Sequence, residues 1–334
     1  MQAMRVCLFV LFLSAMPLAA ADPPTAEIGN GKIRAKLYLP DASSGFYRGT
    51  RFDWSGVIFS LVANGHSYYG PWFTKRNPAI RDFVYEGEDI VAGACSSTMG
   101  PADEFRPVGY DAAAPGGTFL KIGVGALRKP DAAPYDGYRL YEVANPGRWS
   151  IRRSTSAIAF EQSVEDSGFG YVYRKEVRLV KGKSEMVLVH RLKNTGRKAI
   201  ETTVYNHNFL VLDGKAPGEG AVITVPFAIR SARPPNPELA KIEGNRIVYL
   251  KTLIGKDVVT APVEGFGATA SDHAIRIENS ALKAGMSIQG DRPLRSINLW
   301  SIRSNISMEP FIAVSVAPGK VFTWTSTYRF YTMP

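Results

Sequence analysis

The sequence predicts an all-β protein, and its length of 334 residues favours a large β-sandwich over a small one. The main observation is an alternation of apolar and polar residues with a period of two, which is typical of half-buried strands. Short turn sequences separate these segments, and the 31 glycines and 22 prolines suit many tight connections. Helical periodicity is nearly absent, so we expect no helical layer.

The alternation is clearest near the C-terminus, in residues 321–330. There Trp324, Tyr328 and Phe330 fall on one face, and Thr323 and its alternating neighbours fall on the other. This pattern predicts an antiparallel strand with one buried face. The other expected strands are residues 171–180, 186–192, 200–205, 274–277 and 312–316.

Two segments depart from this pattern. Residues 278–284 are the one modest helix candidate, with Gly285 as its stop. Residues 68–110 mix glycines, prolines, aromatic residues and carboxylates. Such a mixture predicts loops that line a cleft.

The N-terminus predicts export. Arg5 precedes a short apolar run at residues 6–18 and three alanines, which together indicate a signal peptide over residues 1–21. The remaining residues, 22–334, are expected to form one domain in the periplasm or outside the cell. The apolar run is too short for a membrane span, and no later run approaches the required length. After cleavage Cys95 is the only cysteine, which excludes an internal disulfide and a multi-cysteine metal site.

The chain is basic, with a formal net charge of +10. Its lysines and arginines are scattered along the sequence and form no basic stripe, which argues against a nucleic-acid partner. A scattered excess of this kind favours solubility or attraction to an acidic envelope or polysaccharide.

The clearest candidates for proton transfer are one histidine and one glutamate. His207 ends an expected strand with an amide on either side, Asn206 and Asn208, and Glu309 lies between two hydrophobic runs. An imidazole and a carboxylate on one sheet can form an acid/base pair. The alternatives are a histidine that hydrogen-bonds to the backbone and a solvent-facing carboxylate beside Pro310.

Two regions around these residues resemble the aldose 1-epimerases, the galactose mutarotase-like proteins. Residues 206–213, Asn-His-Asn-Phe-Leu-Val-Leu-Asp, are similar to that family's Asn-His-x-Tyr/Phe-x-x-Leu signature. Met-Glu-Pro at 308–310, Pro-Gly at 318–319 and Tyr-Arg-Phe at 328–330 follow in the family's order. The resemblance covers residues 170–334 well and the N-terminal half only loosely.

The resemblance implies a galactose mutarotase-like β-supersandwich of large, mostly antiparallel sheets. It also implies a sugar site on the concave face of one sheet, with His207 as the general acid and Glu309 as the general base. As an imidazolium and a carboxylate, the two groups are expected on either side of a bound sugar, separated by the width of its ring. No metal or other cofactor is required.

The chain departs from the family in one respect, because no histidine fits the place of a second, earlier one. Residues 100–105 lie nearest to that place, and Asp103 or Glu104 is expected to hold a sugar hydroxyl there from a loop. Four further residues complete the predicted substrate site: Asn206, Arg51, Trp72 and Trp300. The alternatives are core positions for the tryptophans and a structural ion pair of Arg51 with Asp53 or another acid.

These observations predict an exported aldose 1-epimerase-like protein that acts on a free or terminal sugar. One alternative is a carbohydrate-binding protein without turnover, which the missing histidine favours. Another is a lyase or hydrolase on a similar sandwich; a lyase would use a tyrosine or histidine base and an arginine or asparagine that neutralises a uronic carboxylate. The oligomeric state and a calcium ion held by loop oxygens leave no pattern in the sequence.

Overall fold

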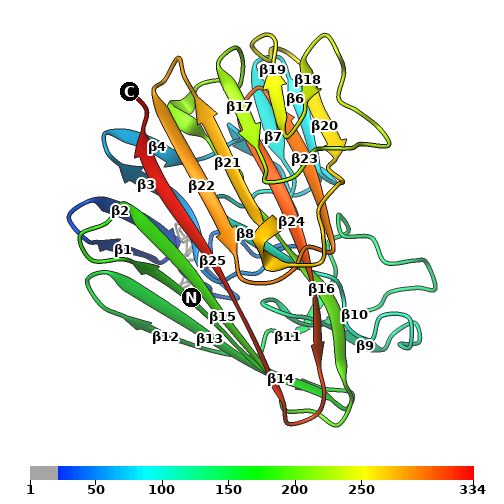
Figure 1. Cartoon of the computed structure of the whole chain (residues 1–334). Helices are drawn as coiled ribbons and strands as arrows, with labels where there is room; N and C mark the ends of the chain where they lie inside the picture. The colour runs from blue at the N-terminus through cyan, green and yellow to red at the C-terminus, as the bar shows by residue number, and fades with distance from the viewer. Residues whose placement is uncertain (1–21) are drawn as a thin grey trace, which may run out of the picture.

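The computed structural model describes residues 22–334, so the predicted signal peptide lies outside the described residues. Strands make up 50% of the structure and helices 2%, which confirms the all-β class. The strands of the described part form five sheets, and two of these are the main layers (Figure 1).

The largest sheet has ten strands, and all its neighbouring strands are antiparallel. Its long central strands run side by side across the molecule (Figure 1). In spatial order its strands are β12 (Arg148–Arg153), β13 (Ala157–Asp166), β14 (Phe169–Leu179), β15 (Glu185–Asn194), β25 (Val321–Thr332), β22 (Ala284–Gly290), β21 (Ala274–Asn279), β17 (Ala221–Thr224), β19 (Arg246–Tyr249) and β18 (Ala240–Glu243).

The second main sheet has five antiparallel strands and carries the functional residues discussed below. Strands that are neighbours in this sheet come from distant parts of the sequence, so the site forms only when the chain folds. The strands are β20 (Val258–Pro262), β23 (Ser296–Ile302), β24 (Asn305–Val316), β16 (Ile200–His207) and β8 (Ala102–Phe105).

Three small sheets and two 3-10 helices complete the described structure. The four-stranded sheet consists of β1 (Thr25–Gly29), β2 (Ile33–Tyr38), β3 (Val57–Ala63) and β4 (His66–Tyr69). The three-stranded sheets consist of β5 (Lys75–Arg76), β7 (Asp89–Ala92) and β6 (Phe83–Glu86), and of β11 (Val143–Asn145), β10 (Gly125–Arg128) and β9 (Thr118–Lys121). The helices are η1 (Leu212–Gly214) and η2 (Ala270–Asp272).

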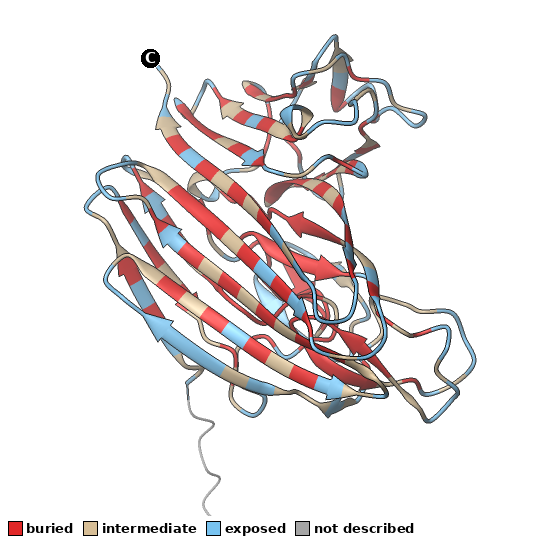
Figure 2. Cartoon of the chain, turned by 60° about the horizontal axis from the view of Figure 1, so that its bottom comes forward, coloured by how far each residue is buried: buried red, intermediate tan, exposed pale blue. Residues whose placement is uncertain are grey.

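The period-two alternation is confirmed as the signal that builds the large sheet. In β25, Trp324, Tyr328 and Phe330 are buried, whereas Thr323 and Arg329 are exposed. Figure 2 shows the same alternation of buried and exposed residues along the long strands. Because successive side chains of a strand point to opposite faces, this sheet covers the core with one face and meets solvent with the other.

The helix predicted over residues 278–284 is wrong. The ends of this segment belong to β21 and β22, and residues 280–283 form a tight turn between them. The side chain of Asn279 accepts a hydrogen bond from the N–H of Leu282 at 3.0 Å. Lys283 has a φ of 54°, a left-handed conformation that a helix interior does not contain. The asparagine turn and the pairing of both flanking strands therefore override a weak helical preference.

The loop predicted over residues 100–105 is also wrong in its last four residues. Residues 102–105 form β8, which pairs with β16 at the edge of the five-stranded sheet. Asp103 and Glu104 are both buried there and point to opposite faces of the sheet. Pairing with β16 satisfies the backbone, so a segment that carries two carboxylates can be a strand.

A buried cluster of charges joins the two main sheets. The carboxylate of Asp103, in the five-stranded sheet, lies 2.8 Å from Nζ of Lys175 on β14 and 3.0 Å from Nε2 of His190 on β15. Lys175 lies 3.6 Å from Asp53, which also accepts the hydroxyl of Tyr173. Burial alone would raise the pKa of Asp103, but Lys175 and His190 lower it well below its usual value. The carboxylate therefore stays ionised between the sheets.

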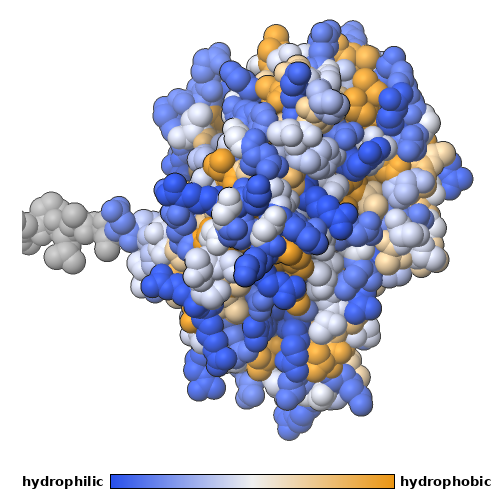
Figure 3. Space-filling view, turned by 60° about the vertical axis from the view of Figure 1, so that its left-hand side comes forward, coloured by the Kyte–Doolittle hydropathy of each residue, from blue (hydrophilic) through white to orange (hydrophobic). Residues whose placement is uncertain are grey.

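Apolar packing supplies the rest of the contact between layers. The main core lies between the ten-stranded sheet and the four- and five-stranded sheets. A second cluster, rich in aromatic residues, includes Trp72, Phe209 and Phe52 and supports the cavity described below. The face of the molecule in Figure 3 is largely hydrophilic, with hydrophobic residues in small separate groups. Within residues 22–334, no helix is long and apolar enough to cross a membrane.

Replacing Lys175 by methionine should destabilise the protein by about 3–5 kcal/mol, because it leaves buried carboxylates without their counter-ion. Chemical denaturation near neutral pH measures the change. Lys193→Met on β15 is the matched control, since Lys193 is exposed and its loss should cost at most about 0.5 kcal/mol. Equal stabilities of the two variants would contradict a structural role for the buried cluster.

Candidate active site

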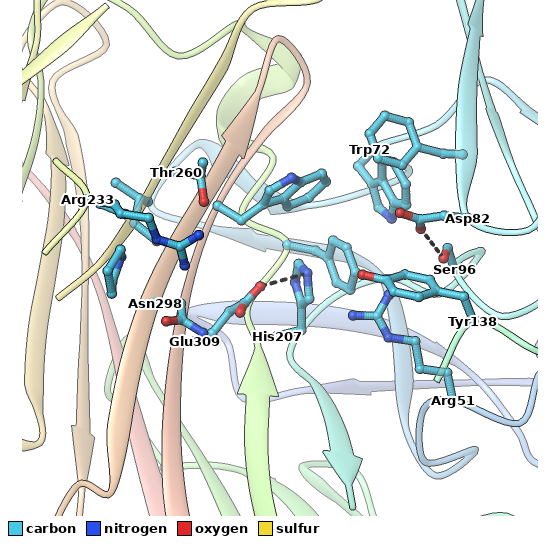
Figure 4. A pocket seen from close by; sticks show the side chains of 16 residues that line it. Arg51, Trp72, Asp82, Ser96, Tyr138, His207, Arg233, Thr260, Asn298 and Glu309 are labelled. Atoms are coloured by element: carbon cyan, nitrogen blue, oxygen red, sulfur yellow. Dashed lines mark hydrogen bonds and ion pairs between the residues drawn. The ribbon is translucent and has the colours of Figure 1, made fainter. Parts of the chain in front are cut away.

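A cavity of about 270 Å³ opens beside the five-stranded sheet. This volume lies near the lower end of the range for ligand cavities and suits a single small polar molecule. Of the residues predicted from the sequence, five line the cavity: His207, Glu309, Arg51, Trp72 and Trp300 (Figure 4). The other three, Asn206, Asp103 and Glu104, do not line it.

Strand register brings the histidine and the carboxylate together. In the pairing of β16 with β24, Tyr205 lies opposite Phe311, and continuing by two residues places His207 opposite Glu309. The neighbouring strand β23 then places Asn298 opposite Glu309. Three functional side chains thus form a row across three adjacent strands. The Nε2 atom of His207 lies 3.2 Å from Oε1 of Glu309 (Figure 4).

This contact differs from the geometry implied by the resemblance. The two groups converge on one cavity as expected, but a distance of 3.2 Å leaves no space for a sugar ring between them. A ligand must therefore approach both groups from the same side.

The ring of His207 is oriented by Ser307. Its Nδ1 atom lies 2.7 Å from the Ser307 hydroxyl, and that same oxygen accepts the backbone N–H of Asn208 at 3.0 Å. Since the oxygen already accepts one hydrogen bond, its own proton can be donated to Nδ1. This arrangement favours the tautomer in which Nε2 carries the ring proton toward Glu309.

The chain after His207 is held in an unusual conformation. Phe209 has a φ of 28°, in the left-handed region that bulky residues rarely adopt. The turn is held by Asn208, whose side chain donates to the carbonyl of Met308 at 2.6 Å and lies 2.9 Å from the hydroxyl of Tyr328. Strain of this kind costs on the order of 1–3 kcal/mol and is typical of functional sites.

The strained turn positions an aromatic support under the imidazole. The ring of Phe209 stacks on His207 with centroids 3.6 Å apart, and Trp72 stacks on Phe209 with centroids 5.4 Å apart. Trp300 stands edge-on to His207 at 5.4 Å. Trp72 is buried and Trp300 is partly exposed. Trp300 is therefore the tryptophan with surface left for a ligand, whereas Trp72 mainly fixes the support.

Burial shifts both candidate groups, His207 and Glu309, toward their neutral forms. The pKa of His207 lies well below its usual value, because burial and then the nearby charge of Arg51 disfavour the imidazolium. Burial raises the pKa of Glu309 to about 7, although Arg51 opposes this shift. The imidazolium expected from the resemblance is therefore disfavoured in the empty cavity. Above about pH 7 Glu309 is therefore ionised and the ring proton on Nε2 of His207 is the one proton between the two groups.

Arg51 is anchored from behind by a buried acid. Its Nε atom lies 2.7 Å from Glu104, and it also donates to the hydroxyl of Tyr205 at 2.9 Å. Its guanidinium lies against the ring of Tyr138, 4.4 Å from the centroid. The expected ion-pair alternative is thus realised with Glu104, whereas Asp53 belongs to the cluster between the sheets. Glu104 acts on the cavity through Arg51.

Asn206 and Asp103 face away from the cavity, because side chains alternate along a strand and His207 takes the cavity side. The amide of Asn206 donates to Asp103 at 3.1 Å, and its oxygen lies 2.9 Å from the Tyr328 hydroxyl. Both residues are buried between the sheets. They position β16 and do not reach a ligand in the cavity.

The cavity also contains polar residues that the sequence did not single out. Asp82 accepts a hydrogen bond from Ser96 at 2.5 Å, and burial raises its pKa. Tyr138, Arg233 and Asn298 also line the cavity (Figure 4). Most come from loops, where no periodic pattern exists to mark them. Asn298 could have been found from the pairing of β23 with the strand that carries Glu309.

Residues 22–334 contain no group of three or more histidine, cysteine, aspartate or glutamate side chains arranged to hold a metal ion. Cys95 is a buried free thiol outside the cavity lining.

Comparison with known proteins finds similar structures but no matching sequence. No protein-family model and no curated protein sequence matches the chain. Among solved structures, an aldose epimerase homologue from C. elegans superposes with a TM-score of 0.54 and 13% identity, covering 93% of this chain and 100% of its own.

Two bacterial proteins are similar to the same extent. A galactose mutarotase-like protein from Lactobacillus casei has a TM-score of 0.51 and 14% identity, covering 92% of this chain and 100% of its own. A galactose mutarotase related enzyme from Lactobacillus acidophilus has a TM-score of 0.52 and 12% identity, covering 93% and 98%. Identities this low carry information on the fold alone. The chain therefore has the galactose mutarotase-like fold that the sequence motifs predict.

Proposed function

We propose that this protein interconverts the anomers of an aldose, with His207 and Glu309 as its proton-transfer groups. The observation that carries the proposal is the contact of 3.2 Å between these two groups in the wall of a cavity of sugar size. The galactose mutarotase-like fold supports the same substrate class. The proposal includes export, which stays a prediction from the signal-peptide pattern of residues 1–21.

The reaction requires two proton transfers at neighbouring oxygens. The C1 hydroxyl loses a proton while the ring oxygen gains one, the C1–O5 bond breaks, and rotation about C1–C2 precedes closure. Both oxygens are bonded to C1, so an acid and a base in contact with each other can serve them from one side. Ionised Glu309 takes the proton of the C1 hydroxyl while Nε2 of His207 donates its proton to the ring oxygen. The proton on Glu309 then passes across the contact to Nε2, and closure uses the same two groups with the oxygens exchanged.

The remaining polar side chains are suited to hold the sugar. Asp82 with Ser96 and Asn298 offer hydrogen bonds to hydroxyl groups from opposite ends of the cavity. The partly exposed face of Trp300 offers an apolar surface to the sugar ring. Such contacts orient C1 toward the acid/base pair.

A second candidate function is carbohydrate binding without turnover. The lowered pKa of His207 and the absence of an opposed acid and base favour it. Binding with no acceleration of anomer exchange would support this alternative. A product with new ultraviolet absorbance would instead support a lyase.

The wild-type protein should accelerate the mutarotation of freshly dissolved aldoses, measured by polarimetry or by NMR exchange. His207→Asn and Glu309→Gln should each lower kcat by about 10²–10⁴-fold, because each removes one proton-transfer group. Glu161→Gln, at an exposed position of β13, is the charge-matched control and should retain full activity. Full activity in His207→Asn would refute the mechanism.

The pH profile of kcat/KM should rise to a plateau with a midpoint near pH 7. Below this pH Glu309 is protonated in the free enzyme and cannot act as the base, because its pKa is about 7. Initial rates between pH 5 and 9, corrected for the uncatalysed reaction, measure the profile. A profile that falls above pH 7, or that stays flat from pH 5 to 9, would contradict this mechanism.

Glu309→Gln should stabilise the folded protein at high pH while it lowers activity. The pKa of Glu309 is raised on folding, so its contribution to stability is present below about pH 4.5 and lost as the pH rises through about 7. At pH 8 the variant should gain roughly 1–3 kcal/mol over the wild type, and at pH 5 most of this gain should disappear. Denaturant unfolding at both pH values tests this, and a gain independent of pH would contradict it.

A further inference from the structure

The charges that line the cavity are not balanced evenly. Arg51 is paired with Glu104 at 2.7 Å, Glu309 contacts His207 at 3.2 Å, and Asp82 is hydrogen-bonded to Ser96. Both lining carboxyl groups have pKa values raised by burial, which reduces their negative charge. Arg51, Glu309 and Asp82 therefore each have a partner within the protein.

Arg233 is the exception. It lines the cavity, and no carboxylate of residues 22–334 lies within ion-pair distance of it. Figure 4 shows its guanidinium turned toward the Glu309 side of the cavity. A charged donor fork without an internal partner, beside a site for a small polar molecule, is suited to bind a planar or tetrahedral anion.

The backbone around Arg233 is held in place. Two backbone hydrogen bonds, at 2.9 and 2.8 Å, join Arg230 to Glu264 just before it. Pro234 and Pro235 follow it directly, and a residue before proline is restricted to extended conformations. Pro235 is buried. Arg233 is itself exposed, but its backbone belongs to a constrained segment, which lowers the entropy that this segment loses when a ligand binds.

We infer that the site takes an anionic aldose, whose carboxylate or phosphate on a carbon other than C1 pairs with Arg233. The inference rests on the proposed function and specifies its substrate class. With C1 at His207 and Glu309, the anionic group points to the Arg233 side of the cavity. The formal net charge of +10 favours the approach of such a substrate from solution.

The test compares three sugars with the wild type and two variants. Anomer exchange of D-glucuronate, D-glucose and D-glucose 6-phosphate is followed by NMR, and kcat/KM is obtained for each. Arg233→Gln removes the unpaired guanidinium. Arg230→Gln is the matched control, because it removes the same charge from an exposed residue nearby that does not line the cavity.

Wild-type kcat/KM should be at least about tenfold higher for one anionic sugar than for D-glucose. Arg233→Gln should reduce this preference by about 10-fold to 100-fold, the range for losing one charge-assisted contact. Arg230→Gln should leave the preference unchanged. The better of the two anionic sugars identifies the group as a carboxylate or a phosphate.

Equal kcat/KM values for neutral and anionic sugars would overturn the inference and leave the proposed function intact. The same holds if Arg233→Gln lowers all rates by one common factor. If no sugar is accelerated, the proposed function is wrong, and calorimetric binding decides the inference. Tighter binding of an anionic sugar that is lost in Arg233→Gln would then support it, and equal or absent binding would overturn it.

Discussion

The structure depends on two adjacent carboxylates of one short edge strand, β8. Asp103 points between the main sheets, where Lys175 and His190 bind it, and Glu104 points the other way and holds Arg51 at the cavity. Buried charges tolerate little displacement, because each one that loses its partner is left unsolvated. The same strand therefore fixes the distance between the sheets and the position of a charged group in the site.

The candidate site follows from this frame by strand register. Because β16 and β24 pair antiparallel, a single register places His207 opposite Glu309, and a slip by one residue would turn one of them to the other face. Ser307 and the strained Phe209 then set the orientation of the imidazole. The enclosure that these contacts require also removes water from both groups. That desolvation lowers the pKa of His207 and raises the pKa of Glu309, so the usual order of the two values is reversed.

Much of the fold could be predicted from local patterns, and the site only in part. Period-two alternation located β14, β15 and β25, because a half-buried sheet imposes that pattern on its own sequence. It failed at residues 278–284, where an asparagine turn decided the conformation, and at Asp103 and Glu104, which looked like loop residues. His207 and Glu309 were found from motifs. Arg233 was missed, because nothing in its sequence neighbours indicates that its loop reaches the cavity.

The sequence by itself determined the all-β class, the main strands and the two residues that we propose as proton-transfer groups. These properties are encoded locally, in alternation, turn residues and short motifs. Only the tertiary structure decided that His207 touches Glu309, that Glu104 holds Arg51 at the cavity, and that Arg233 has no carboxylate partner among residues 22–334. Each of these depends on which strands and loops become neighbours in space and on how far water is excluded there, and both arise only when distant segments pack together.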